Sequence, residues 1–319
     1  MEKFLKQVFL FVFPILIVGY FIDILLSDTL KKSNSYTGEF PTWNALYDGK
    51  VNSDIVICGS SRATYHFDSK MIESELKTRA FNLGIVGHSF AMQNLRNDLL
   101  LTNNKLPKLL IYSVDARTLA SNKELYNPDQ FLPYLFWNSK LEKTINNYDT
   151  FTWYDYKIPL IRFYGKFTAL KTIFSLILHP KNNPILRIKG FKGNISIWNN
   201  DFEKAKIKLG KYKTEINKEL KSDFENFIKK FQLKNIKIIL IYSPEYIDGQ
   251  KFIINRNESV QIFKSLAKKY NLTYLDYATD LICFDKKYFY NASHLNKTGA
   301  EFFTAKVTDT IQKLKILEK

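Results

Sequence analysis

The chain has 319 residues, of which 45% are hydrophobic and 15% aromatic, a composition that excludes a disordered chain and allows a large buried core. Lys and Arg outnumber Asp and Glu by 47 to 31, which gives a net charge of +16. The excess is mostly lysine and is spread along the chain without a dense basic block, so we expect no nucleic-acid partner. A charge of this size suits an anionic glycan or a lipid surface.

The N-terminal segment predicts a membrane anchor. An apolar run covers residues 8–22 and ends at Asp23, and its aromatic and aliphatic flanks make it long enough to span a membrane. No small-x-small cleavage site follows, so we expect residues 1–30 to be the uncleaved signal anchor of a single-pass protein. A buried core helix is the alternative, disfavoured because Pro14 and Gly19 lie inside the run and apolar residues cover every face.

The charges that flank this run bear on its orientation. Lys3 and Lys6 precede it, while Lys31 and Lys32 follow it, so the positive-inside rule favours a cytoplasmic N-terminus only slightly. We therefore expect a cell-membrane protein whose main domain is extracytoplasmic, either periplasmic or on the outer surface.

After a polar tether at 31–52, strand-like and helix-like segments alternate through a domain that we expect to span 53–319. This alternation predicts an α/β fold of the flavodoxin-like three-layer α/β/α type, a parallel sheet covered by helices on both faces. The expected strands are 54–58, 79–83, 109–114, 236–242 and 272–275, and the expected helices are 67–76, 89–101, 259–270 and 298–314.

The alternation fails between about 119 and 213, where the chain is rich in aromatic residues and lysine. We interpret this stretch as a helix-rich insertion that forms a lid or a substrate wall. Within it, residues 158–178 predict an amphipathic helix that packs on the core or lies against the membrane surface; a second span is the minor alternative, because the segment carries three basic residues.

The two cysteines and four histidines limit which disulfides and metal sites the chain can form. Cys58 ends an apolar run, where a small buried hydrophobe is expected, and a bridge to Cys283 stays open because disulfide geometry is strict. Two cysteines cannot form a disulfide framework, and no Cys/His cluster has zinc spacing, so we expect no metal site and no cofactor. The histidines are His66, His88, His179 and His294.

The segment Gly59-Ser60-Ser61-Arg62 follows the first predicted strand and precedes a helix. In parallel sheets, ligands bind at the carboxyl ends of strands, next to helix N-termini. Glycine allows a tight turn there, and nearby backbone N–H groups can stabilise an oxyanion, so Ser61 is a candidate nucleophile. In the alternative interpretation, Ser60 and Ser61 only cap the next helix.

Two further segments supply candidate partners for Ser61. Gly87 lies between the second strand and the following helix, where its N–H can face an oxyanion. His294 lies in a polar loop that leads into the last helix, and histidine is suited to act as a general base near neutral pH.

Taken in this order, the three segments resemble the SGNH (GDSL-like) hydrolase superfamily. Its first block, Gly-Asp-Ser, is here Gly59-Ser60-Ser61, which implies that Ser61 is the nucleophile. The oxyanion glycine of the second block matches Gly87, and the last block, Asp-x-x-His-Leu-Asn-x-x-Gly, matches residues 291–299 except at its first position.

The resemblance covers about residues 53–117 and 236–315 and leaves the insertion uncovered. Gly-Ser-Ser-Arg looks like the variant found in membrane-anchored members that modify envelope polysaccharides, including proteins similar to the D-alanyl transfer protein DltD and the alginate O-acetyltransferase accessory proteins. The family's oxyanion Asn of the third block has no counterpart here. Arg62, Asp115 and Arg117 are therefore candidates only for contacting substrate.

The position of the triad acid is occupied by Asn291. Replacing that acid by its amide in a serine-protease triad costs on the order of 10⁴ in rate. Three alternatives stay open: Asp285 or Asp280 replaces the acid, a Ser–His dyad suffices, or the site is impaired.

The resemblance implies acyl-ester chemistry on a cell-envelope polysaccharide or glycan, by an O-acyltransferase or esterase that uses Ser61 and His294. The implied partners are the membrane, a glycan or acylated carrier, and a membrane acyltransferase. The alternative is a catalytically impaired accessory or binding protein of the same fold that serves envelope polysaccharide assembly.

Overall fold

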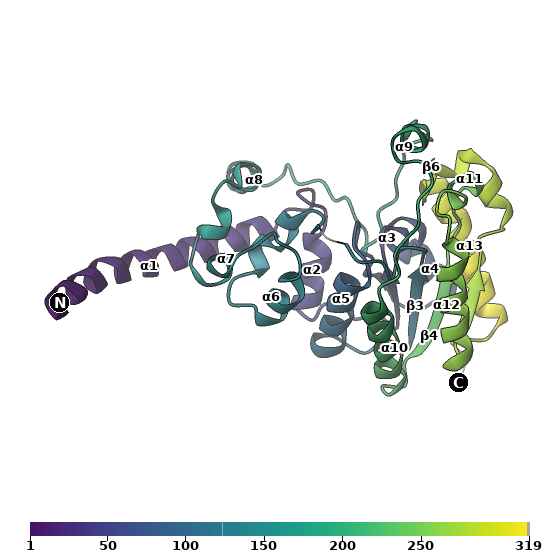
Figure 1. Cartoon of the computed structure of the whole chain (residues 1–319), viewed down its shortest axis with the longest axis horizontal. Coiled ribbons are helices and arrows are strands. Elements are labelled where there is room, and N and C mark those ends of the chain that lie inside the picture. The colour runs from purple at the N-terminus through teal and green to yellow at the C-terminus, as the bar shows by residue number, and fades with distance from the viewer. Residues whose placement is uncertain (123, 318–319) are drawn as a thin grey trace. The chain divides into compact units, whose positions relative to one another are not determined.

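The computed structural model describes residues 1–122 and 124–317, which form two compact units (Figure 1). The first, here called the N-terminal unit, comprises Met1–Asn44 and Lys123–Leu186. The second, the α/β unit, comprises Ala45–Asn122 and Arg187–Lys319. The stretch expected as one insertion, 119–213, therefore contributes to both units.

A five-stranded parallel sheet forms the centre of the α/β unit. Its order, β2-β1-β3-β4-β5, is that of the flavodoxin-like doubly wound folds, so the predicted fold class is confirmed. The strands lie close to the predicted bounds: β1 (Ile55–Gly59), β2 (Ala80–Asn82), β3 (Leu109–Val114), β4 (Lys237–Tyr242) and β5 (Thr273–Asp276).

Every side chain of β1 is buried, and successive side chains of a strand point to opposite faces of the sheet. Both faces of this sheet must therefore be covered, and helices cover them. Ile55 and Ile57 belong to a core that includes Phe67 and Phe303, on the face covered by three helices. These are α3 (Ser61–His66), α4 (Ser69–Leu76) and α13 (Lys297–Lys313). An aromatic cluster around Tyr112 fills the other face, with α5 (Phe90–Asn103), α10 (Lys218–Gln232) and α12 (Arg256–Lys269).

Shorter elements complete the α/β unit. A hairpin of β6 (Phe289–Asn291) and β7 (His294–Leu295) precedes α13. The others are α9 (Asp201–Leu209), α11 (Ile247–Gln250), η3 (Leu281–Phe284) and η4 (Lys286–Tyr288). Cys58 and Cys283 are free and buried, so Cys58 packs as the expected small hydrophobe and the bridge that was left open does not form.

The N-terminal unit is helical and differs from the sequence expectation at two places. The segment expected as a polar tether contains α2 (Phe40–Tyr47), where Phe40 and Trp43 are fully buried. The predicted helix at 158–178 begins only at α8 (Phe167–Leu178), because Pro159 and a left-handed Gly165 interrupt it. The unit also contains η1 (Pro128–Tyr134), α6 (Ser139–Ile145), α7 (Trp153–Lys157) and η2 (Ile161–Phe163).

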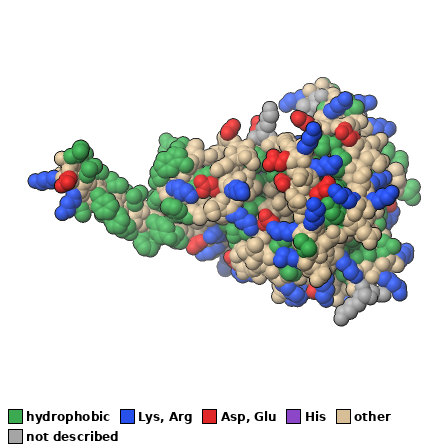
Figure 2. All heavy atoms as spheres, turned by 60° about the horizontal axis from the view of Figure 1, so that its bottom comes forward, with side chains coloured by type: hydrophobic (Ala, Val, Ile, Leu, Met, Phe, Trp, Pro, Cys, Tyr) green, Lys and Arg blue, Asp and Glu red, His purple; other side chains and the backbone are tan. Residues whose placement is uncertain are grey.

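The first helix, α1 (Glu2–Lys31), is long and apolar enough to cross a membrane, with a mean hydropathy of 2.6. Its hydrophobic side chains are exposed over the half that precedes Gly19 (Figure 2). Asp23, which interrupts the apolar run in the sequence, is buried and forms an ion pair of 2.5 Å with Arg162. The C-terminal part of α1 is therefore built into its unit, and the N-terminal part projects from it.

Candidate active site

The site lies at the carboxyl ends of β1, β3 and β4, where Ser61 begins α3 directly after β1. Gly59 makes the turn, with φ +135°. A Cβ at this position would lie 2.5 Å from the carbonyl oxygen of Ser113 on the neighbouring strand, so only glycine fits. The chain can thus reverse within one residue from a buried strand to a helix that presents Ser61.

Of the two serines in this turn, one caps the helix and the other contacts His294. Ser60 is the N-cap of α3: its hydroxyl accepts from the N–H of Arg62 at 3.3 Å and donates to Asp115 at 2.6 Å. The Oγ of Ser61 lies 2.7 Å from Nε2 of His294. The capping interpretation therefore holds for Ser60, and the side chain of Ser61 is left to the histidine.

The β6–β7 hairpin places His294 against Asn291. The two residues are partners across a two-residue turn, and Oδ1 of Asn291 accepts from the backbone N–H of Ser293 and of His294, both at 3.0 Å. The same oxygen lies 3.0 Å from Nδ1 of His294. Because an amide oxygen only accepts, Nδ1 carries the proton and Nε2 is left as the acceptor that faces Ser61.

Neither acidic residue considered as a substitute reaches this histidine. Asp285 pairs with Lys287, and Asp280 pairs with Lys306 while capping η3. Of the three alternatives left open, the contacts of Asp285 and Asp280 therefore do not support replacement of the acid by either residue. The described residues form a Ser–His–Asn arrangement, whose catalytic use stays a prediction.

The ring of His294 is held between aromatic neighbours. Tyr290 stacks on it at 5.4 Å with an interplanar angle of 8°, and Tyr65 meets it edge-on at 5.4 Å. Burial, helped by the nearby positive charge of Arg62 and opposed by Asp115, lowers the pKa of His294 to about 3. The imidazole is therefore neutral, and able to accept a proton, across the physiological range.

His66 is a residue of this site that the sequence did not reveal. Its Nε2 accepts from the N–H of Leu295 at 3.1 Å, and its Nδ1 lies 2.9 Å from Oγ of Ser243. Burial, and then the charges of His294 and Arg62, lower its pKa well below the usual value. A neutral His66 thus pins the strand that carries the candidate base, a positioning role without a signal in local sequence.

A cavity of about 190 Å³ opens over the Ser61–His294 pair. Gly87, with φ +78°, lies in its wall as predicted, and Asn122 lines it with Nδ2 3.4 Å from the carbonyl oxygen of Gly87. Whether the N–H groups of Ser61 and Gly87 hold an oxyanion stays a prediction. A second cavity of about 610 Å³ shares His294, Ser293, Arg117, Tyr212, Glu245 and Ile253 with the first.

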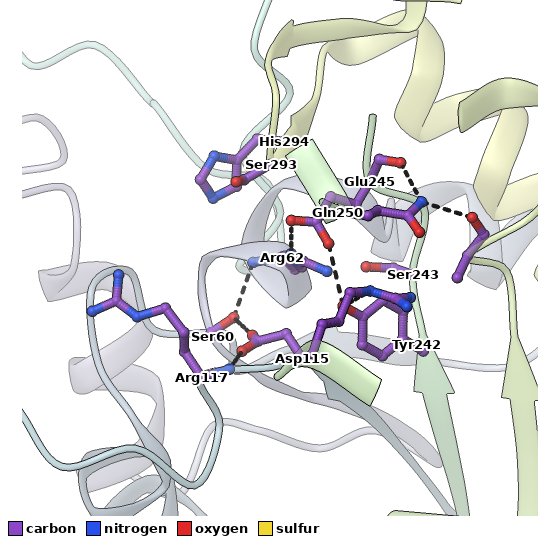
Figure 3. A network of polar contacts seen from close by, with 12 residues as sticks. Ser60, Arg62, Asp115, Arg117, Tyr242, Ser243, Glu245, Gln250, Ser293 and His294 are labelled. Atoms are coloured by element: carbon purple, nitrogen blue, oxygen red, sulfur yellow. Dashed lines mark hydrogen bonds and ion pairs between the residues drawn. The ribbon is translucent and has the colours of Figure 1, made fainter. Parts of the chain in front are cut away.

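The three candidates for substrate contact line the first cavity in different ways (Figure 3). Asp115 is buried and holds Ser60 and the N–H of Arg117, so it braces the turn. Arg117 has an exposed side chain that reaches both cavities. Arg62 is buried, lies over the ring of Tyr242 and pairs with Glu245 at 2.8 Å.

Replacing Glu245 with alanine should lower the free energy of unfolding by about 3–5 kcal/mol, because a buried guanidinium would lose its counter-ion. Urea unfolding of the full chain in detergent measures this. The double replacement Arg62→Met with Glu245→Met should recover most of the loss, and Glu301→Ala, at an exposed pair, should cost less than about 1 kcal/mol. An unchanged unfolding midpoint for Glu245→Ala would contradict the assignment.

No family model matches the chain, and no curated protein matches it. It is similar in structure to an acetyl xylan esterase, at 14% identity over 81% of this chain and 98% of that chain, with a TM-score of 0.41. It is also similar to a protein described as lipolytic and of the G-D-S-L family from Desulfitobacterium hafniense (13% identity, 81% and 99%, TM-score 0.38). At such identities and TM-scores the likeness is distant, and the site must be judged on its own geometry.

Proposed function

We propose that the protein carries out acyl-ester chemistry at Ser61, as an SGNH-type O-acyltransferase or esterase. The observation that carries the proposal is the contact of 2.7 Å between Oγ of Ser61 and Nε2 of His294, with Nδ1 held by Asn291. A nucleophile within reach of a base that a third group orients is the arrangement that activated serines require. The motifs that resemble the SGNH blocks supply these same side chains.

In the proposed reaction, Oγ of Ser61 attacks the acyl carbonyl while Nε2 of His294 takes the hydroxyl proton. The N–H groups of Ser61 and Gly87 stabilise the oxyanion. When the intermediate collapses, the C–O bond to the donor alcohol breaks and His294 returns the proton to that alcohol. A sugar hydroxyl or water then attacks the acyl-serine ester and loses its proton to His294. The bond between the acyl carbon and Oγ of Ser61 breaks, and His294 returns the proton to Oγ.

The second cavity supports a glycan as the acyl acceptor or donor. It joins the Ser61–His294 site and is lined by the aromatic residues Phe202, Tyr212 and Phe252, by the cations Arg117 and Lys213, and by the carboxylates Asp201, Glu215 and Glu245. Its volume of about 610 Å³ is that of a small-ligand site. Aromatic faces beside charged groups of both signs suit sugar rings, whose hydroxyls can hydrogen-bond to those groups.

The membrane helix supports placing this chemistry at the cell envelope. With α1 as an uncleaved anchor, the α/β unit would lie on the extracytoplasmic side of the cell membrane. Anchoring beside membrane-bound acyl carriers and a membrane acyltransferase favours transfer to a glycan over hydrolysis.

Treating the full chain with a fluorophosphonate probe should give one covalent adduct, which peptide mass spectrometry locates on Ser61. Ser60→Ala is the matched control, because the neighbouring hydroxyl caps α3 and should not be needed for labelling. An adduct on another residue, or the same labelling in Ser61→Ala, would contradict the nucleophile.

One observation favours a second candidate function, a non-catalytic accessory protein for envelope polysaccharide assembly. Asn291 gives His294 a hydrogen bond without the negative charge that stabilises an imidazolium. Absence of labelling between pH 5 and pH 10, with glycan binding retained, is the result expected of the accessory protein.

A further inference from the structure

We propose that the N-terminal unit lies in the membrane interface around α1, with α8 parallel to the bilayer plane. This rests on the proposed role of α1 as a membrane anchor. The surface concerned, here called the interfacial surface, consists of Tyr164 and of the side chains of α8 that face outward: Phe167, Phe174, Ile177 and Leu178.

These side chains are far more exposed than large apolar groups normally are. Phe167 is 79% exposed, Phe174 60% and Leu178 69%. Their spacing of seven and four residues places them on one stripe of the helix, while Ala169 and Ile173 on the opposite side are buried. An apolar stripe on a helix too short to span a membrane is typical of a helix that lies in the interface.

The place where α8 packs along α1 sets the depth of α8 in the membrane. Pro159, on the segment leading to α8, lies 3.6 Å from where a Cβ on Gly19 would stand, and α8 itself packs against α1. Gly19 and Asp23 are the first buried positions of α1. Residues 4–22 of α1, exposed except at Gly19, form a stretch about 28 Å long, close to the ~30 Å of a bilayer's hydrocarbon core. The segment that leads to α8 therefore meets α1 where α1 leaves the hydrocarbon.

Other exposed side chains of the N-terminal unit are of the types found at membrane interfaces. Trp137 and Trp153 are each 66% exposed, and Tyr164 is 88% exposed. Trp and Tyr gather at membrane interfaces, where their rings are buried among headgroups and their polar atoms stay wet. Lys171, one turn after Phe167, lies within the same stripe, from where its long side chain can reach the lipid phosphates.

A buried ion pair makes the arrangement rigid. Arg162 binds Asp23 and Oγ of Ser27 on α1, and the N–H of Leu160 donates to Asp23 at 2.7 Å. These contacts fix the loop before α8 to one face of α1. We infer that lipid covers the interfacial surface. This surface continues the lipid-facing side of α1, to which the loop before α8 is fixed.

Spin labels on the full chain in lipid nanodiscs test the proposal. Phe174→Cys carries the reporter, Val12→Cys on α1 is the bilayer control and Leu233→Cys, on an 85% exposed residue of the α/β unit, is the water control. The native Cys58 and Cys283 are buried and should stay unlabelled. We expect the ratio of oxygen to nickel-chelate accessibility at 174 to exceed that at 233 by at least about threefold.

The outcomes separate the two claims. A lipid-like ratio at 12 with a water-like ratio at 174 overturns the interfacial surface and leaves the anchor standing. Water-like ratios at both positions overturn the anchor as well. Spin–spin broadening at 174 that disappears when labelled chain is diluted with unlabelled chain shows a second copy on this surface, which also overturns the assignment to lipid.

Discussion

Replacing Asn291 with aspartate should raise the rate of ester turnover by about 10²- to 10⁴-fold. The upper figure is the loss that the opposite change causes in a serine-protease triad. An aspartate here can keep all three contacts that Oδ1 of Asn291 makes, two with backbone N–H groups and one with Nδ1 of His294, and it adds a charge that stabilises the imidazolium. The positive charge of Arg62, which disfavours a protonated His294, sets the lower figure.

The pH profile gives a second readout of the same change. Burial and Arg62 lower the pKa of His294 to about 3, so falling pH should not protonate the base of the parent chain until well below pH 5. A carboxylate at 291 raises that pKa, so the acidic limb of kcat/KM should move to higher pH. Hydrolysis of p-nitrophenyl acetate between pH 4 and pH 9 measures both effects, with Asn271→Asp as the surface control. A slower variant, or an acidic limb that does not move, would contradict the role given to Asn291.

Replacing Ser61 with alanine should lower the rate of turnover by an amount that depends on residue 291. In a complete triad, removal of the serine costs about 10⁶ in kcat, whereas removal of the acid alone costs about 10⁴. With asparagine already in the acid position, Ser61→Ala should therefore cost about 10²-fold. In the Asn291→Asp background the same substitution should cost about 10⁶-fold, because the three groups then act as a unit.

The control for this experiment is Ser74→Ala, an exposed serine on α4 that should leave the rate unchanged. Ser61 makes its side-chain contact with His294, so its loss should leave the circular dichroism spectrum and the unfolding midpoint near those of the parent. Equal losses in the two backgrounds would mean that residue 291 does not act through the serine.

Much of this fold could be predicted, because parallel strands buried on both faces appear as apolar runs. The run before Gly59 and the run at 236–242 are of this kind, and both are central strands. The helix α10 was missed although Phe224, Phe227, Ile228 and Phe231 have helical spacing, because it adjoins a stretch without alternation. The helix α2 was missed because it has only eight residues and stands between polar segments.

The parts of the site that depend on the type of one residue could be predicted from the sequence. The parts that depend on contacts between distant segments could not. Ser61 and His294 were found from their motifs, and the structure brings them into contact. That His66 supports the same hairpin depends on a contact between distant segments, which no local pattern reports. Which of Ser60 and Ser61 faces the histidine depends on the direction of the turn at Gly59. The sequence indicates that a turn is there but not where each serine side chain points.

The contact between Ser61 and His294 joins the two ends of the α/β unit, which has a consequence for biosynthesis. Ser61 leaves the ribosome early, while the hairpin that carries its base is among the last parts to be made. Until that hairpin folds against His66 and α3, the hydroxyl of Ser61 has no imidazole beside it. The pair therefore forms only after nearly the whole α/β unit has been made, and an incomplete chain has Ser61 without its partner.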